Sequence, residues 1–124
     1  MHVLRHLVTA VKPGGLVLDL QVIRPDPRVE VDGHLVCEIE GRSLFQKADA
    51  AAAAVDEAVA AGRLLEEALD DHDACTHYRT GADLVADFAG EERKIPTAAV
   101  PIVRALERPC VVRERCRLRR LRTI

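Results

Sequence analysis

The feature that most constrains this chain is an almost wholly apolar run of eight residues, 16–23 (Leu-Val-Leu-Asp-Leu-Gln-Val-Ile), directly after Lys-Pro-Gly-Gly at 12–15. A run this short suits a strand covered on both faces better than a buried helix. The proline and glycines end the amphipathic helix that apolar spacing predicts over residues 2–11. Helix, tight turn and buried strand in this order predict the parallel sheet of an α/β protein.

A β-hairpin is expected next. Residues 29–39 alternate around a central Asp-Gly pair, the dipeptide that best tolerates the positive φ angles of a type I′ turn. This register places Val31 opposite His34 and Val29 opposite Val36. The other expected elements are an irregular segment at 24–27, a long alanine-rich helix at 48–69, a polar loop at 70–73, a short strand at 75–78, a helix at 80–89, a short helical stretch from 95 and a strand at 110–121.

The last of these strands carries an unusual charge pattern. Arg113, Arg115, Arg117 and Arg119 alternate with mainly apolar residues, which predicts a strand with one solvated face of arginines. Residues 48–92 hold twelve acids against two arginines, whereas residues from 104 onward hold eight arginines against two acids. The two segments are therefore expected to attract each other, within one chain or between two.

Composition narrows the class of protein. With 124 residues, 48% of them hydrophobic, and a net charge of -2, the chain fits one ordered domain over residues 1–124. No window approaches 18 uncharged apolar residues, and the break at 12–15 argues against a secretory signal, so we expect no membrane partner and a cytoplasmic location. Three aromatic residues and no Gly-x-Gly argue against a nucleic-acid partner and against a nucleotide-binding loop.

Two groups of residues have side chains suited to chemistry. Residues 71–77 contain aspartates, histidines and a cysteine, which are all zinc ligands, but no second ligand pair of similar spacing exists, and we expect no metal site. Asp19 is the only charge inside the apolar run, and a buried carboxylate needs a partner or a cavity. It therefore faces a site or pairs with an arginine, and the sequence leaves both alternatives open.

The order of these elements resembles a known family. Residues 6–19 are similar to the signature of class I S-adenosylmethionine-dependent methyltransferases in which a helix and Leu-Lys-Pro-Gly-Gly precede the fifth strand. The sequence Tyr-Arg-Thr-Gly-Ala-Asp-Leu at 78–84 resembles the Phe-Arg-Thr-x-x-Glu-Leu step of many members. Residues 111–121 resemble their final antiparallel strand.

This resemblance implies a partial Rossmann-like methyltransferase sheet with a helix, a buried strand, a β-hairpin, a long helix and C-terminal antiparallel strands. The family's glycine-rich loop and ribose-binding acid, which precede this segment, are absent from the 124 residues. The chain then corresponds to the substrate-side half, with Asp19, Gln21, Arg24 and Tyr78 lining the acceptor side. No catalytic or cofactor-binding residue is expected in it, and S-adenosylmethionine would bind only with a complementary N-terminal half.

Three origins fit such a segment: a fragment, a gene whose N-terminal half is separate, or a stand-alone module that dimerises to cover its sheet edge. The alternative function is a non-catalytic, homo-oligomerising or partner-binding module. In that alternative, the acidic helix of one chain meets the arginine strand of another.

Overall fold

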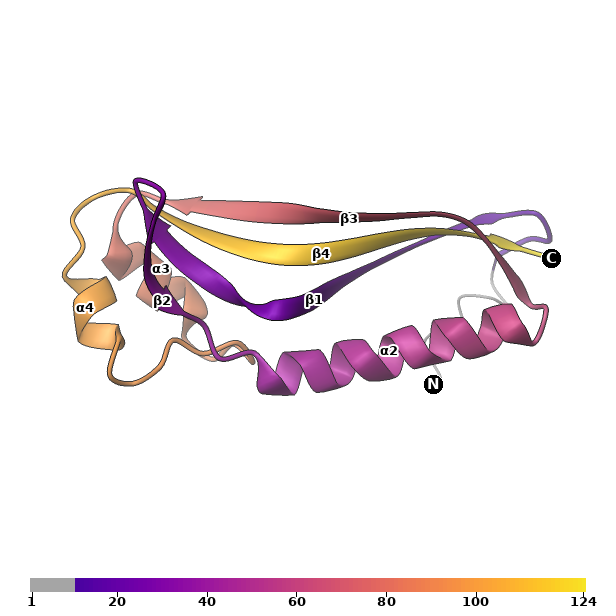
Figure 1. The fold of residues 1–124 in the computed structure, drawn as a ribbon, viewed down its shortest axis with the longest axis horizontal. Helices are drawn as coiled ribbons and strands as arrows, with labels where there is room; N and C mark the ends of the chain where they lie inside the picture. Colours follow the sequence, from indigo (N-terminus) through magenta and orange to yellow (C-terminus); the bar gives the residue numbers. More distant parts are fainter. Residues whose placement is uncertain (1–10) are drawn as a thin grey trace.

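A computed structural model of the chain describes residues 11–124 (Figure 1). The helix expected over residues 2–11 lies outside this range, apart from its last residue. The elements are β1 (Leu16–Val31), β2 (His34–Glu38), α2 (Arg42–Ala60), β3 (Leu64–Tyr78), α3 (Gly81–Phe88), α4 (Val100–Arg104) and β4 (Cys110–Thr123). None of the helices in residues 11–124 is long and apolar enough to span a membrane.

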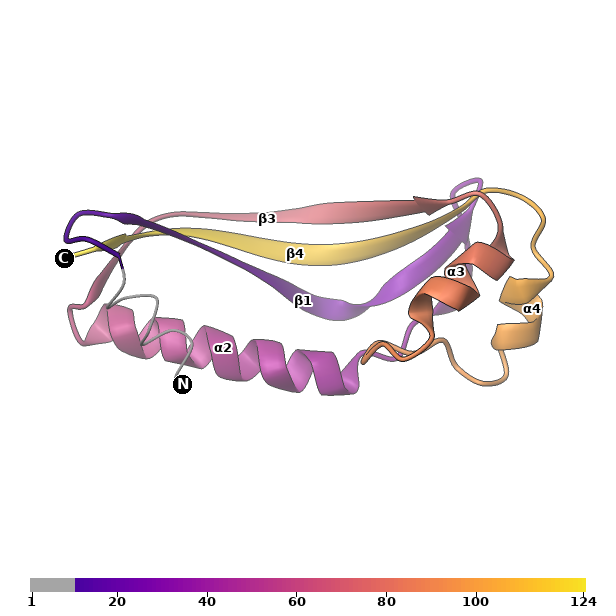
Figure 2. The same ribbon diagram turned by 180° about the vertical axis from the view of Figure 1, so that it is seen from behind.

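The strands form one four-stranded sheet in the order β2-β1-β4-β3, in which every neighbouring pair is antiparallel. The fold is therefore mixed α/β, but the predicted parallel sheet is wrong. β1 and β3 run in the same direction and α2 connects them, yet β4 lies between them and runs in reverse. Figure 2 shows α2 beneath one half of these three strands, with α3 and α4 gathered at their other end.

The hairpin was largely predictable from its turn. The two turn residues have φ angles of 50° and 79°, as a type I′ turn requires. Val31 lies opposite His34, as predicted, but Val29 lies opposite Cys37 and not Val36, because the register shifts between positions 29 and 30.

The segment predicted to be irregular lies inside β1 as a bulge. Ile23 pairs with Arg115 and Arg28 pairs with Arg113, so residues 24–27 stand opposite Glu114 alone. Two prolines remove two backbone donors, which is tolerated at a bulge where the ladder is already interrupted.

The long helix was predicted with the wrong boundaries. α2 begins six residues earlier than expected and ends at Ala60, where Gly62 follows with a φ of 76°. The predicted end of the helix, the loop at 70–73 and the strand at 75–78 are all parts of β3. Local propensity favours a helix there, but pairing with β4 stabilises the extended conformation.

The short helices follow their local signals. The hydroxyl of Thr80 accepts a hydrogen bond from the backbone N–H of Asp83 and caps α3, as predicted. Pro101 stands in the first turn of α4, where its missing N–H costs no hydrogen bond.

Two apolar clusters hold the helices against different parts of the sheet. One joins α3 and α4 to Val112 of β4, and the other joins α2 to Leu121 of the same strand, nine positions further on. Figures 1 and 2 show α2, α3 and α4 on the same side of the strands.

The uncovered part of one face is apolar. Leu18 and Leu20 of β1 are both 60% exposed, and Leu16 and Leu65 beside them are also exposed. The prediction that residues 16–23 are covered on both faces is therefore wrong for the described residues, because α2 packs on only one side of them.

A substitution at Gly81 tests how closely α3 packs against α4. A Cβ at this position would lie 1.7 Å from the backbone oxygen of Val103, so Gly81→Ala should lower the free energy of unfolding in urea by about 3 kcal/mol. The control is Gly33→Ala, where a Cβ meets nothing within 4 Å and only the positive φ is strained. Gly33→Ala should lower the free energy of unfolding by roughly 1–2 kcal/mol. Equal losses in the two variants would contradict this account.

Candidate ligand cleft between helix α2 and the sheet

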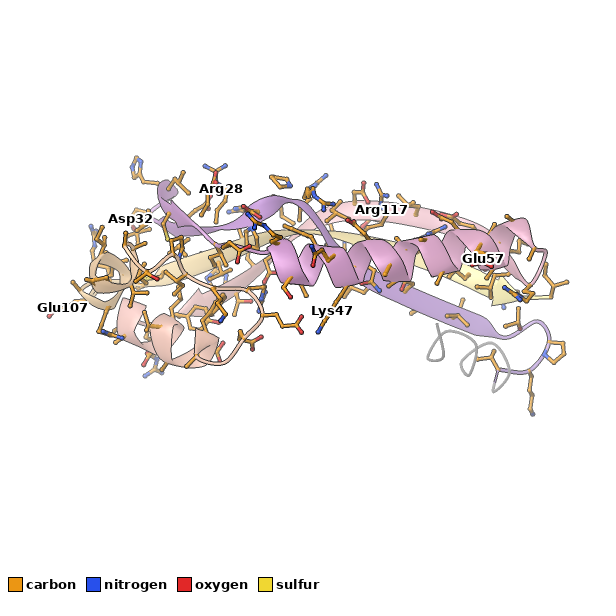
Figure 3. All side chains as sticks on the ribbon, turned by 90° about the horizontal axis from the view of Figure 1, so that it is seen from below. Arg28, Asp32, Lys47, Glu57, Glu107 and Arg117 are labelled. Atoms are coloured by element: carbon orange, nitrogen blue, oxygen red, sulfur yellow. The ribbon has the colours of Figure 1, made fainter. Side chains whose placement is uncertain are left out.

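A cleft of about 500 Å³ lies between α2 and the face of the sheet beneath it. Small side chains on α2 leave this space, since Ala48 and Ala52 are one helical turn apart and both line it. The charged lining residues come from α2 and from three strands: the acids Asp19, Asp49, Asp56 and Glu66, and the arginines Arg24, Arg117 and Arg119. Figure 3 looks onto α2 and labels Arg117 beside it.

Three of the four residues expected on the acceptor side meet in this cleft. Asp19 and Gln21 are on the part of β1 that faces α2, and Arg24 stands at the bulge, where both Nη atoms donate to Asp49 of α2 at 2.9 and 3.0 Å. The Arg24 guanidinium also stacks 5.1 Å from the centre of the Phe45 ring. This double anchorage fixes one end of the cleft.

Tyr78 lies apart from the other three, at the end of β3. Its hydroxyl donates to Asp87 at 2.5 Å, and its ring packs edge-on against Phe88. Burial, together with this hydrogen bond, raises the pKa of Tyr78 to about 12. The structure therefore places Tyr78 in the packing around α3, and its acceptor-side role stays a prediction.

The carboxylate of Asp19 has an unusual position. It lies opposite Arg119 in the β1–β4 register, yet within residues 11–124 its hydrogen bond comes from the amide of Gln21 at 3.0 Å and no arginine binds it. Of the two alternatives for this residue, the described part of the chain supports a cavity.

Arg119 is 7% exposed and holds the opposite wall of the cleft. Its Nη1 lies 2.8 Å from Asp56 of α2, and its Nη2 lies 2.8 Å from Glu66 of β3. Although burial acts to lower the pKa of Arg119, hydrogen bonds to these two carboxylates raise it overall. The predicted solvated face of arginines is therefore wrong at this position, because α2 covers it.

The remaining arginines of β4 pair with acids of β3, except that Arg113 binds chiefly Glu30 of β1 at 3.0 Å. Arg117 binds both oxygens of Asp71 at 2.8 and 2.9 Å, and Arg115 binds Asp73 at 3.1 Å. Hydrogen bonds from Arg117 lower the pKa of Asp71 against the opposing effect of burial. The charge attraction expected from the sequence thus operates within one chain, and it joins two strands where the prediction had a polar loop at 70–73.

The aspartates, histidines and cysteine at 71–77 do not come together around one point. They lie along β3, where residues on the same face are roughly 7 Å apart and neighbours point to opposite faces. In residues 11–124 no group of three or more histidines, cysteines or acids could hold a metal ion. All four cysteines are free thiols.

Comparison of the chain with protein-family models, with the curated proteins and with the solved structures finds no match.

Sequence reasoning missed the contribution of α2 and of Arg119 to the cleft. The available signal was the run of alanines at 48 and 50–54, and it does not indicate which strand packs opposite. The acids of β3 were assigned to the end of a helix and to a polar loop, which hid their pairing with β4.

Acid should weaken the β3–β4 pairing. Because the pKa of Asp71 is lower in the folded than in the unfolded chain, its contribution to stability is complete above the unfolded value of about 4 and is lost as pH falls through the folded value. Asp71→Asn should lower the urea midpoint at neutral pH and make its fall between about pH 5 and pH 2 shallower. Glu57→Gln, an exposed acid of α2, should change neither quantity. An unchanged acid dependence in Asp71→Asn would contradict the assignment.

Proposed function

We propose that the chain is a methyltransferase-like domain that corresponds to the substrate-side half of a class I S-adenosylmethionine-dependent methyltransferase. The motifs at 6–19 and 78–84 support this proposal, and so does the position of β4, which is antiparallel to both its neighbours. On this proposal β1, β4 and β3 are one end of a Rossmann-like sheet.

The observation that carries the proposal is the unfinished edge of β1. β2 pairs with β1 only over residues 28–31, so in the described part of the chain residues 16–24 have β4 on one side and no strand on the other. The outer backbone N–H and C=O groups of this edge are free to pair with another strand. Leu18 and Leu20 lie exposed along the same stretch.

A complementary half would pair with the free edge of β1 and cover its exposed leucines. A strand added to β1 satisfies the free backbone groups, and helices flanking that strand would cover the exposed leucines. That half supplies the glycine-rich loop, and S-adenosylmethionine bound there supplies the methyl group. This chain contributes the acceptor side through Asp19, Gln21 and Arg24, and its part in catalysis is to position the nucleophile.

The first test concerns the cofactor. Titration calorimetry should detect no binding of S-adenosylmethionine to the 124-residue chain alone. It should detect about one molecule per complex when the segment encoded directly upstream is co-expressed, and that segment should contain a glycine-rich βαβ unit. Stoichiometric binding by the chain alone, or an upstream frame without such a unit, would contradict the proposal.

The second test concerns the edge. Leu18→Glu should weaken association with the upstream segment, because it buries an unpaired charge in the new contact. Leu35→Glu is the matched control, since Leu35 is 47% exposed but lies on β2, away from this edge. Equal effects of the two variants in a pull-down would count against the β1 edge.

The same edge is the feature that favours the alternative, a homo-oligomerising module. Two copies of β1 could pair edge to edge across a two-fold axis. Sedimentation distinguishes the two functions: the proposed function predicts a monomer at micromolar concentration, whereas a dimer that Leu18→Glu dissociates would establish the alternative.

A further inference from the structure

We infer that the cleft between α2 and the sheet binds a small organic cation, a protonated amine carried on an apolar body. As a statement about the methyl acceptor this inference rests on the proposed function. As a statement about binding it concerns the 124-residue chain alone.

The sign of the ligand follows from the charges around the cleft. Counting Asp71, which binds Arg117, the lining and its direct partners contain five carboxylates and three guanidinium groups. Arg119 serves two of the carboxylates at once, and within residues 11–124 no arginine binds Asp19. After the ion pairs form, the cleft therefore keeps an excess of negative charge.

An anion fits this cleft poorly. Arg24 is held by Asp49 through two hydrogen bonds, Arg117 is held by Asp71 through two, and Arg119 lies between carboxylates on either side. A ligand carboxylate or phosphate would have to break these pairs and then lie beside the acids that remain. A cation meets no such cost, and it compensates the excess negative charge of the cleft.

The apolar part of the lining defines the body of the ligand. Ile23 and Val22 of β1, Ala48 and Ala52 of α2, and Leu69 of β3 line the cleft together with the charged groups. A volume of about 500 Å³ lies in the range of small-molecule sites, and these five apolar residues stand beside eight polar or charged residues in the lining. A primary amine on an aromatic or aliphatic body matches both parts of this lining.

The charge assignment is tested with two probes of the same shape. 2-Phenylethylamine and 3-phenylpropionate have similar length and ring but opposite charge. In a titration followed by amide NMR spectra, the amine should shift signals of residues 19–24 and 48–56, and the carboxylate should bind at least roughly tenfold more weakly. Equal affinities, or no shifts with the amine up to about 10 mM, would overturn the inference.

The site is tested with paired variants on the same chain. Asp19→Asn, which is isosteric, should weaken amine binding by about tenfold or more, because it removes the charge that has no arginine partner. Glu57→Gln is the charge control, since Glu57 is an exposed acid of α2 outside the lining and is labelled in Figure 3. An equal loss of affinity in the two would show a general charge effect and no site.

A second pair of variants tests the location of the site without changing its charge. Ala52→Leu fills the cleft and should abolish amine binding, whereas Ala53→Leu, at the exposed neighbouring position, should leave it unchanged. Retained binding in Ala52→Leu would overturn the location.

These outcomes are distinguishable from failure of the proposed function. Amine binding without cofactor binding by the two halves would leave the cleft site standing and remove the methyl acceptor role. The reverse result would remove the site and leave the methyltransferase assignment.

Discussion

The pairing of the acidic strand β3 with the arginine strand β4 is the interaction on which the rest of the fold depends. β3 buries only its first residue, Leu64, so apolar packing alone gives it little reason to join the sheet. It is held by a backbone ladder along its whole length and by ion pairs such as Arg117–Asp71. An exposed ion pair contributes little alone, but opposite charges along two neighbouring strands favour one partner over others. This choice of partner makes β4 a central strand.

The central position of β4 explains both the cleft and the open edge. Val112 packs against α3 and α4 toward one end of β4, and Leu121 packs against α2 toward the other end. Between these two clusters the layer under α2 contains charged groups, and small alanines keep the helix from closing onto them. On the other face, the leucines of β1 stay exposed. The cleft and the edge of β1 that has no strand partner in residues 11–124 thus lie on the same stretch of β1.

The two faces of β1 differ in character near the cleft. Asp19 and Gln21 line the cleft from one face of β1, while Leu18 and Leu20 are exposed on the other. A strand that pairs with the outer edge of β1 would therefore lie beside both the cleft residues and the exposed leucines.

The sequence by itself determined the features that depend on neighbouring residues. The turn between β1 and β2, the Thr80 cap of α3 and the extended conformation of β4 were predicted because each is decided within a few positions of the chain. The resemblance to methyltransferases grouped Asp19, Gln21, Arg24 and Tyr78, of which the first three line the cleft and Tyr78 lies apart. Tertiary structure alone decided that residues 61–69 leave the helix, that Arg119 is buried and that one face of β1 is open. Strand order and helix cover depend on contacts between residues 50 to 100 positions apart, such as Glu66 with Arg119, which local propensity does not contain.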